Sequence, residues 1–269
     1  MPPSSTRVVF LGTGNAFNTG GRGSQCIRIE PRGGAPFLVD LGPTAIAAME
    51  RFRVRPADHD TVFLTHLHGD HVAGWPFFLL HGAFMERRSR PLRLVGPEGS
   101  RDQLETLCRG TYPDILEKAP FPVEYIEIPV RRGSHSAAGI DFDVVPMEHH
   151  SSSIGYRFRL PGASIAVSGD TRWCPGLEEL AAGSDLLVVE CSSVEKTEYA
   201  HVSVEELGAG NGRLSSRKTA VVHLTDEVAR AIEALSLQRV VAARDGMILE
   251  MDSADDGWIM REPHEEVTP

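Results

Sequence analysis

The sequence predicts an α/β domain in which two packed β-sheets are flanked by helices. Short apolar runs rich in Val, Ile and Phe alternate with helical stretches, and Gly, Pro or Asp separates them. The chain has 269 residues, of which 41% are hydrophobic and 24% charged, as is typical of a globular protein with a substantial core. Because the strands are many, we expect two layers of sheet rather than one.

The expected elements follow one another along the whole chain. The strands are expected at residues 8–11, 25–30, 37–40, 61–64, 92–95, 123–128, 140–146, 155–160, 164–168, 186–190, 219–223 and 247–250. The helices are expected at residues 43–52, 73–85, 97–108, 176–182, 203–211 and 227–236. Pro43 and Pro97 would occupy the first turn of a helix, where proline is tolerated. Ser203 and Glu206 have the spacing of a capping box at a helix start.

The net charge and the composition of the chain argue against some classes of binding partner. The chain has 27 Lys and Arg against 37 Asp and Glu, a net charge of −10, which argues against binding to long nucleic acids. A small phosphate-bearing substrate stays compatible, because a local site can be positive on an acidic protein. No apolar run is long enough to cross a membrane, and the start of the chain lacks the pattern of a signal peptide. We therefore expect a cytoplasmic protein without a membrane anchor.

We expect the chain to form one compact unit, and we expect its cysteines to be free. We expect a single domain over residues 1–252 and an acidic, flexible tail over 253–269. Four cysteines at wide, irregular spacings form no CxxC pair, so we expect free thiols that are buried or partly buried.

One apolar strand is followed directly by a cluster of side chains that can act as metal ligands. After Phe63 and Leu64 come His66, His68, Asp70 and His71. Imidazole and carboxylate are ligands for zinc and similar ions, and a loop that leaves a strand can turn nearby side chains inward. His66 and His68 would face one metal, and Asp70 and His71 a neighbouring one. The alternative, a solvated polar loop, does not explain four such residues after a buried strand.

This HxHxDH segment resembles the signature of the metallo-β-lactamase fold superfamily, which implies a four-layer αββα sandwich. Three later elements resemble the remaining ligand motifs of that family: 147–156 with His149, 168–171 with Asp170, and 221–225 with His223. The resemblance implies two metal ions that share Asp170. One would be held by His66, His68, His149 and Asp170, and the other by Asp70, His71, His223 and Asp170.

Two such cations lower the pKa of a shared water toward neutrality and stabilise charge on a phosphoryl or acyl group. The ligand types suit zinc first, with manganese as an alternative; iron is also compatible. The sequence therefore predicts a metal-dependent hydrolase.

Two branches of the superfamily are similar to this chain. The opening GTGNAF, the extended histidine segment and Ser168–Arg172 resemble ribonuclease Z, which grips tRNA with a long arm. Only residues 157–169 lie where that arm should be, and the family's His-Glu-Ala-Thr element reads Val-Glu-Cys-Ser at 189–192. The compact phosphodiesterase branch of the carbon–phosphorus lyase pathway is a closer match. It implies His201 as the general acid, although its cysteine-rich additional zinc site is absent.

The expected activity is hydrolysis of a small (cyclic) nucleotide or ribose phosphodiester, with Asp70 and His201 as catalytic residues. The alternatives are a ribonuclease Z-like RNA 3′ endonuclease, a lactone or thioester hydrolase, and a metal-bearing binding or sensor module without turnover. A small ester is the expected partner, and a homodimer is the default assembly.

Several other residues have two interpretations at this stage. The glycine turn at 12–14 is either a plain β-turn or a loop beside the substrate. Arg22 and Arg172 could contact a phosphate or simply be solvated. His150 neighbours a ligand but falls outside the ligand spacing, and Trp75 could lie at the pocket edge. The remaining histidines are expected to be surface or core residues; they are His59, His81, His135 and His264.

Overall fold

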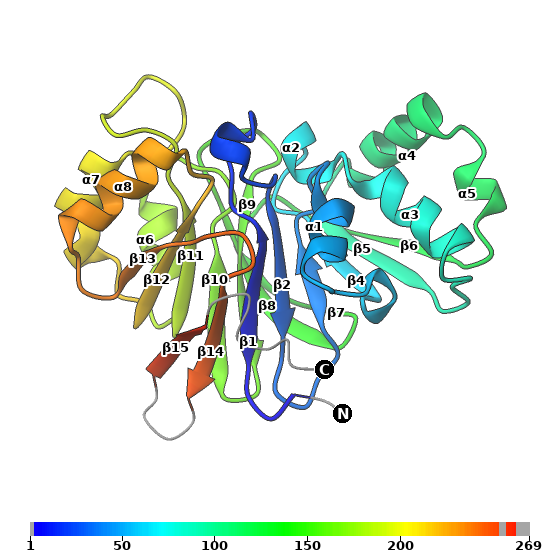
Figure 1. The fold of residues 1–269 in the computed structure, drawn as a ribbon, viewed down its shortest axis with the longest axis horizontal. Helices are drawn as coiled ribbons and strands as arrows, with labels where there is room; N and C mark the ends of the chain where they lie inside the picture. The colour runs from blue at the N-terminus through cyan, green and yellow to red at the C-terminus, as the bar shows by residue number, and fades with distance from the viewer. Residues whose placement is uncertain (1–2, 253–256, 262–269) are drawn as a thin grey trace.

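The protein is a sandwich of two β-sheets with helices on both outer faces, as the sequence predicts (Figure 1). The computed structural model describes residues 3–252 and 257–261. Within these residues one sheet has eight strands in the order β15-β14-β1-β2-β3-β4-β5-β6, and the other has seven in the order β13-β12-β11-β10-β9-β8-β7. The four-layer αββα architecture is confirmed.

The eight-stranded sheet combines the first half of the chain with its last strands. Its strands are β1 (Arg7–Gly12), β2 (Cys26–Glu30), β3 (Phe37–Val39), β4 (Thr61–Phe63), β5 (Leu92–Pro97), β6 (Val123–Ile128), β14 (Ile248–Asp252) and β15 (Gly257–Arg261). The pairs β3–β4, β4–β5 and β5–β6 are parallel, and the other pairs are antiparallel.

The seven-stranded sheet comes from the second half of the chain. Its strands are β7 (Gly133–Ala137), β8 (Ile140–Pro146), β9 (Ile154–Leu160), β10 (Ala163–Val167), β11 (Leu186–Glu190), β12 (Lys218–Val222) and β13 (Val240–Ala242). Strands β10 to β13 run parallel to one another, whereas β7, β8, β9 and β10 are joined as antiparallel neighbours.

Helices cover the outer face of each sheet and bury a second layer of apolar side chains there. Against the first sheet lie α1 (Ala45–Arg51), α2 (Gly69–Val72), α3 (Trp75–Phe84), α4 (Ser100–Thr111) and α5 (Ile115–Lys118). Against the second lie α6 (Pro175–Ala181), α7 (Val204–Gly210) and α8 (Asp226–Leu235). The short 3₁₀ turns are Thr19–Gly21, Pro56–Asp58 and Asn211–Arg213. The predicted capping box is present at the start of α7.

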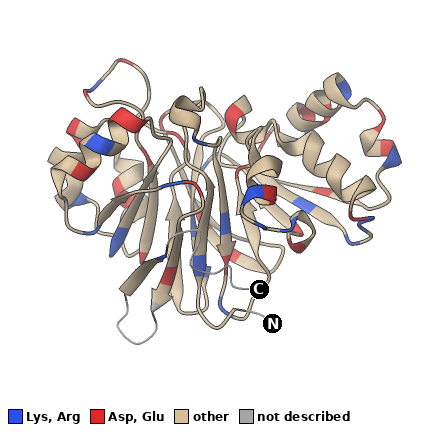
Figure 2. Ribbon diagram, in the orientation of Figure 1, with Lys and Arg blue, Asp and Glu red and all other residues tan. Residues whose placement is uncertain are grey.

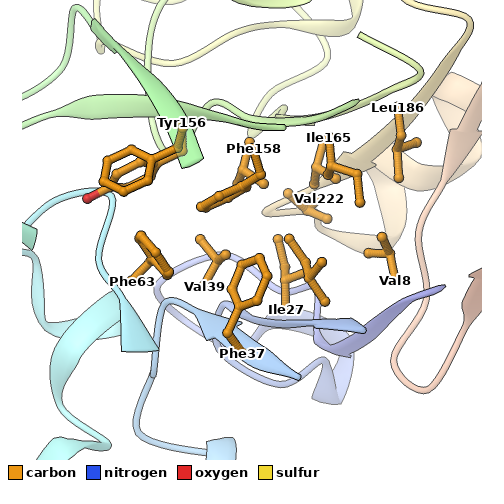
Figure 3. Packing of buried hydrophobic residues seen from close by; sticks show 14 of the residues in the cluster. Val8, Ile27, Phe37, Val39, Phe63, Tyr156, Phe158, Ile165, Leu186 and Val222 are labelled. Carbon is orange, nitrogen blue, oxygen red and sulfur yellow. The ribbon is translucent and has the colours of Figure 1, made fainter. Parts of the chain in front are cut away.

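The central core fills the space between the two sheets (Figure 3). The Phe63 ring packs edge-on against Phe158 of the facing sheet, with ring centroids 4.9 Å apart, and against Phe37 at 5.3 Å. Such edge-to-face aromatic pairs add to the free energy of burying the rings. Because β4 ends at Phe63, three residues before His66, this packing fixes where the histidine segment leaves the sheet.

The differences from the sequence prediction fall mainly at the edges of the sheets. Strands β7, β13 and β15 were not expected, and each is the last strand at an edge of its sheet. Strand β7 is a largely polar segment and β13 has only three residues, so neither has the length and apolarity expected of a buried strand, and β15 falls in the segment expected to be a tail. The helix expected from Pro97 begins at Ser100 instead, because Pro97 still pairs with Ile128 as the end of β5. Pro43 lies two residues before α1.

The predicted tail is only partly described. Gly257–Arg261 forms β15 and pairs with β14, whereas 253–256 and 262–269, and with them His264, lie outside the described residues. All four cysteines are buried and free, as expected. In the described part of the chain no helix has the length and apolarity to cross a membrane. Acidic and basic positions are interspersed over both helical layers (Figure 2).

Candidate metal centre

All the side chains predicted from the sequence as metal ligands meet at one edge of the sandwich. The parallel strands β3, β4, β10, β11 and β12 all end at this edge, which is uppermost in Figure 1. His66 follows β4, Asp170 follows β10, and His223 follows β12. His149 lies between β8 and β9, and α2 carries Asp70 and His71. The ends of parallel strands are a usual place for a site, because the loops there converge.

One group of ligand-type atoms comes from His66, His68 and His149, whose ring nitrogens lie within 4.8 Å of one another. His149 donates from Nδ1 to the carbonyl oxygen of Ala200 at 2.9 Å, which leaves a lone pair on Nε2. That Nε2 lies 3.0 Å from Nδ1 of His68. Two ring nitrogens that approach so closely can both face a single cation.

A second group contains Asp70, His71, Asp170 and His223. Oδ2 of Asp70 lies 3.3 Å from Nε2 of His71 and 3.2 Å from Nε2 of His223. Asp170 is the link between the groups, because its oxygens lie 3.4 Å from His71, 3.3 Å from His223, and 3.9 Å from both His66 and His149. Despite the burial of Asp170, the neighbouring His223 and His71 hold its pKa well below the usual range.

Two buried nitrogens supply a test of whether a metal fits. Nε2 of His66 and Nε2 of His71 are buried and make no hydrogen bond among the described residues. A buried polar atom without a partner costs free energy, and both atoms point toward the carboxylate of Asp170. Coordination to a cation would satisfy both, so the donor set fits divalent metal ions.

Asp40 supports this centre and was missed in the sequence. Its fully buried carboxylate accepts hydrogen bonds from Nδ1 of His71 at 2.8 Å, from the Thr65 backbone at 2.8 Å and from Oγ1 of Thr65 at 2.9 Å. Asp40 has a left-handed φ of 61°, a conformation uncommon outside glycine and asparagine-like residues. The bond to His71 fixes the tautomer that leaves Nε2 free. Asp40 could have been found from the sequence, because it is an aspartate directly after a buried strand.

Glu190 organises the opposite side of the centre. Its buried carboxylate accepts from Nδ1 of His201 at 2.8 Å and from Oγ of Ser192 at 3.1 Å. Ser192 in turn accepts from Nδ1 of His223 at 2.8 Å. Burial alone would lower the pKa of His201, but the hydrogen bond and charge of Glu190 raise it to about 9. Glu190 therefore favours the protonated form of His201, and Nε2 of His201 is not used by Glu190.

The residues with two interpretations are now placed. Arg22 binds structural partners, since it donates to Asp226, Thr13 and the Ala243 carbonyl. The side chain of Arg172 is exposed, and Trp75 is buried in the core under the first sheet.

His150 is exposed and lies within hydrogen-bond distance of Ser152. Of the other histidines, His59 is buried, His81 is paired with Glu86, and His135 stacks on Phe142.

The glycine turn at the start of the chain lies beside the centre. Gly14 pairs with Leu224, the residue after His223. The following residues, Asn15 to Phe17, line a cavity of about 510 Å³ together with His201 and His223. Of the two interpretations of this turn, the structure therefore supports a loop beside the site.

Comparisons with known proteins agree with this geometry. Residues 6–245 match the family model described as "Anti-Pycsar protein Apyc1". The ribonuclease Z of Staphylococcus epidermidis is 24% identical, over 86% of this chain and 94% of that protein. Among solved structures, the metallo-β-lactamase fold protein YhfI from Bacillus subtilis has a TM-score of 0.75 at 18% identity, covering 91% of this chain and 99% of that one. A diphosphatase from the PhnP family has a TM-score of 0.73 at 18% identity, covering 92% and 98%. The chain has the metallo-β-lactamase fold, and it belongs to the family described as anti-Pycsar protein Apyc1.

Proposed function

We propose that this metallo-β-lactamase-fold hydrolase is a dinuclear phosphodiesterase acting on a small nucleotide or ribose phosphodiester, including cyclic ones. The observation that carries the proposal is the position of His201. It is an imidazole held by Glu190, with its ring 4.7 Å from His149 and 5.4 Å from His223 between centroids. An acid beside a cluster of metal-type ligands suits a reaction whose leaving group needs a proton.

The proposed ligand assignment follows the two groups. His66, His68, His149 and Asp170 would hold one divalent cation, and Asp70, His71, His223 and Asp170 the other. Zinc fits this set first, with manganese as the alternative. When bound, the two cations would lower the pKa of a coordinated water and stabilise negative charge on the phosphoryl oxygens.

The chain's own residues would direct the proton and the attacking water. Asp70 lies between His71 and His223, where its carboxylate can also accept a hydrogen bond from the attacking water. The water gives up one proton to solvent, and its oxygen forms a bond to phosphorus while an ester P–O bond breaks. The proton on Nε2 of His201 passes to the departing oxygen, and Glu190 stabilises the imidazole throughout.

The surroundings of the centre favour a small substrate. Strand β9 ends at Leu160 and β10 begins at Ala163, so a tight hairpin stands where the ribonuclease Z resemblance would place a tRNA-gripping arm. The net charge of −10 also disfavours a long polyanion. The cavity of about 510 Å³ beside His201 has a volume that suits a nucleotide.

The test compares two leaving groups. The protein is reconstituted with Zn²⁺ or Mn²⁺ and assayed on 3′,5′-cyclic nucleotides and on bis(p-nitrophenyl) phosphate, with His68→Ala as the inactive control. His201→Gln should lower kcat on the cyclic nucleotide by about 10²-fold or more, because a ribose alkoxide needs protonation. The loss on the p-nitrophenyl ester should be much smaller, because nitrophenolate leaves without a proton. Equal losses on both substrates would argue against His201 as the acid.

The same assay separates the alternative activities. A lactone, a thioester and a precursor tRNA are included, since the similarity to ribonuclease Z favours testing RNA 3′ ends. Turnover of one of these without phosphodiester hydrolysis would replace the proposed function. Two retained metal ions with no turnover of any ester would favour a binding or sensor module.

A further inference from the structure

We propose that a cavity at the edge of the sandwich opposite the metal centre is a second ligand site, which binds a small carboxylate with an apolar body. We call it the arginine cavity, because Arg32, Arg93 and Arg159 lie around it. The inference does not depend on the proposed hydrolysis, since none of the metal-type ligands lines this cavity.

The arginine cavity lies between the two sheets and has a volume of about 300 Å³. One wall is formed by the turn after β2 and by Phe37 and Thr61, the first residues of β3 and β4. The other wall comes from the facing sheet, at residues 138–140 and 159–161. Because β3 and β4 end at the metal centre, their first residues lie at the opposite edge. Figure 1 shows the turns that follow β2 and β9 at this lower edge.

Most of the walls are apolar. The apolar side chains that line the cavity are Pro31, Pro36, Phe37, Ile140, Leu160 and Pro161. A bare inorganic anion would leave these walls in contact with water, whereas a ligand with an apolar body gains free energy by covering them. A volume of about 300 Å³ is at the small end of ligand-binding cavities, so the body must be small.

The charged side chains of the lining favour an anion. Three of them are arginines, and the one acid among them is Asp60. The carboxylate of Asp60 already accepts hydrogen bonds from Arg88 and Arg90, which compensate its charge. The chain as a whole has a net charge of −10, so this excess of positive charge is a local feature of the cavity.

The three arginines keep hydrogen-bond donors for a ligand. Arg93 donates to Glu124 from Nε at 2.9 Å, and Arg159 contacts Asp143 through Nη1. Neither Nη atom of Arg93 has a hydrogen-bond partner in the described part of the chain, and the guanidinium of Arg32 has none there at all. A planar guanidinium with free N–H groups matches the two oxygens of a carboxylate.

Arg32 is held where it can close the cavity over a ligand. Its backbone N–H donates to Oγ1 of Thr6 at 3.2 Å, and the next N–H, of Gly33, donates to the carbonyl oxygen of Pro3 at 3.0 Å. Nη2 of Arg32 lies 3.7 Å from the point where a Cβ of Gly162 would stand, so the side chain reaches from one sheet to the turn of the other. Because Arg32 is exposed, the carboxylate would lie at the solvent side, with the apolar body directed toward Phe37.

The first experiment separates the charge of the ligand from its apolar body. Isothermal titration of the metal-loaded protein compares octanoate with octanamide, which lacks the charge, and with acetate, which lacks the body. Octanoate should bind at least about tenfold more tightly than either of the others. Equal binding of octanoate and octanamide would overturn the role of the arginines.

Two variants test the position of the ligand. Arg32→Gln should weaken octanoate binding about tenfold or more, because a charge-assisted pair is lost. Ala35→Trp, at an exposed position of the lining, should weaken it at least as much by filling the cavity. The matched control is Arg230→Gln, which removes an exposed arginine of α8 outside the cavity and should leave the affinity unchanged. Circular dichroism should establish that all three variants are folded.

A third variant separates this site from the metal centre, where a carboxylate could also bind. His68→Ala should retain the octanoate affinity of the wild type, because the arginine cavity is at the other edge of the sandwich. Affinity that is lost in His68→Ala, or that is unchanged in both Arg32→Gln and Ala35→Trp, would overturn the inference. Phosphodiester hydrolysis by the same preparations is a separate measurement, so the proposed function can fail while the arginine cavity is supported, and the reverse.

Discussion

His71 and His59 are both fully buried histidines with an unpartnered Nε2, yet they lie in opposite electrostatic surroundings. His71 donates from Nδ1 to Asp40 and faces Asp170. Burial alone would lower its pKa, but these two carboxylates raise it well above its ordinary value. For His59, burial and the nearby Arg28 lower the pKa to about 3.

The difference shows that burial of a histidine does not by itself indicate a ligand. Carboxylates around His71 favour positive charge there, whether it is a proton or a metal cation. Around His59 the cations Arg28 and Arg88 disfavour any further positive charge. The same side chain at the same burial therefore belongs to a candidate metal centre in one region and to the structural core in the other.

Removing the shared carboxylate should have the largest effect. Asp170 lies within 3.9 Å of ring nitrogens of four proposed ligands, so Asp170→Asn removes the negative charge on which both groups converge. We expect loss of both metal ions by elemental analysis after dialysis, and a fall in hydrolysis of about 10³-fold or more. Asp141→Asn, at an exposed position of β8, is the control. A variant that keeps two ions per chain would contradict the assignment of Asp170.

Removing the carboxylate behind His71 should have a smaller effect. Asp40→Asn eliminates the charge that orients His71 without touching a proposed ligand directly. We expect metal affinity, measured by competition with a chelating dye, to fall by about 10- to 100-fold. Circular dichroism should establish that the variant is folded. Unchanged affinity in a folded variant would mean that Asp40 acts only on the fold.

Replacing His59 should change the pH dependence of the free energy of unfolding rather than the metal affinity. Its pKa of about 3 in the folded state lies below the ordinary value of 6.5, so below pH 6.5 the unfolded chain binds a proton that the folded chain does not. The free energy of unfolding should therefore fall with decreasing pH, by about 2 kcal/mol between pH 7 and pH 5 from this group. Urea unfolding is measured for the wild type and for His59→Gln, both with EDTA. The free energy of unfolding of the variant should lack the part of the pH dependence that comes from His59. An identical pH dependence in the two proteins would show that His59 is not buried as a neutral group.

The smallest effect should come from Ser192, which relays between His223 and Glu190. Ser192→Ala leaves Nδ1 of His223 without this acceptor but retains the charge of Glu190. We expect a loss in metal affinity of about fivefold, the size of one neutral hydrogen bond. Ser134→Ala, whose hydroxyl bonds Asp143 far from the centre, is the control. A loss as large as that of Asp40→Asn would mean that the Ser192 relay matters as much as a buried carboxylate.

The sequence by itself determined the central strands and the side chains that the structure gathers as ligand-type groups. Each of these is a local pattern: an apolar run, and histidines and aspartates placed directly after it, as at His66, Asp170 and His223. A local pattern can be recognised without knowledge of contacts to distant residues, because a buried strand must be apolar along its own length.

Only the tertiary structure decided the edge strands, the supporting carboxylates and the cavity. Strand β7 is formed by a polar segment, Gly133–Ala137, that pairs only because β8 is already in place. Asp40 and Glu190 became partners of His71 and His201 because separate strands end at one edge. Phe17 and Tyr199 are 182 residues apart in the sequence and line one cavity only after both sheets have stacked. Contacts between distant segments depend on the packing of the whole chain, and no short stretch of sequence encodes them.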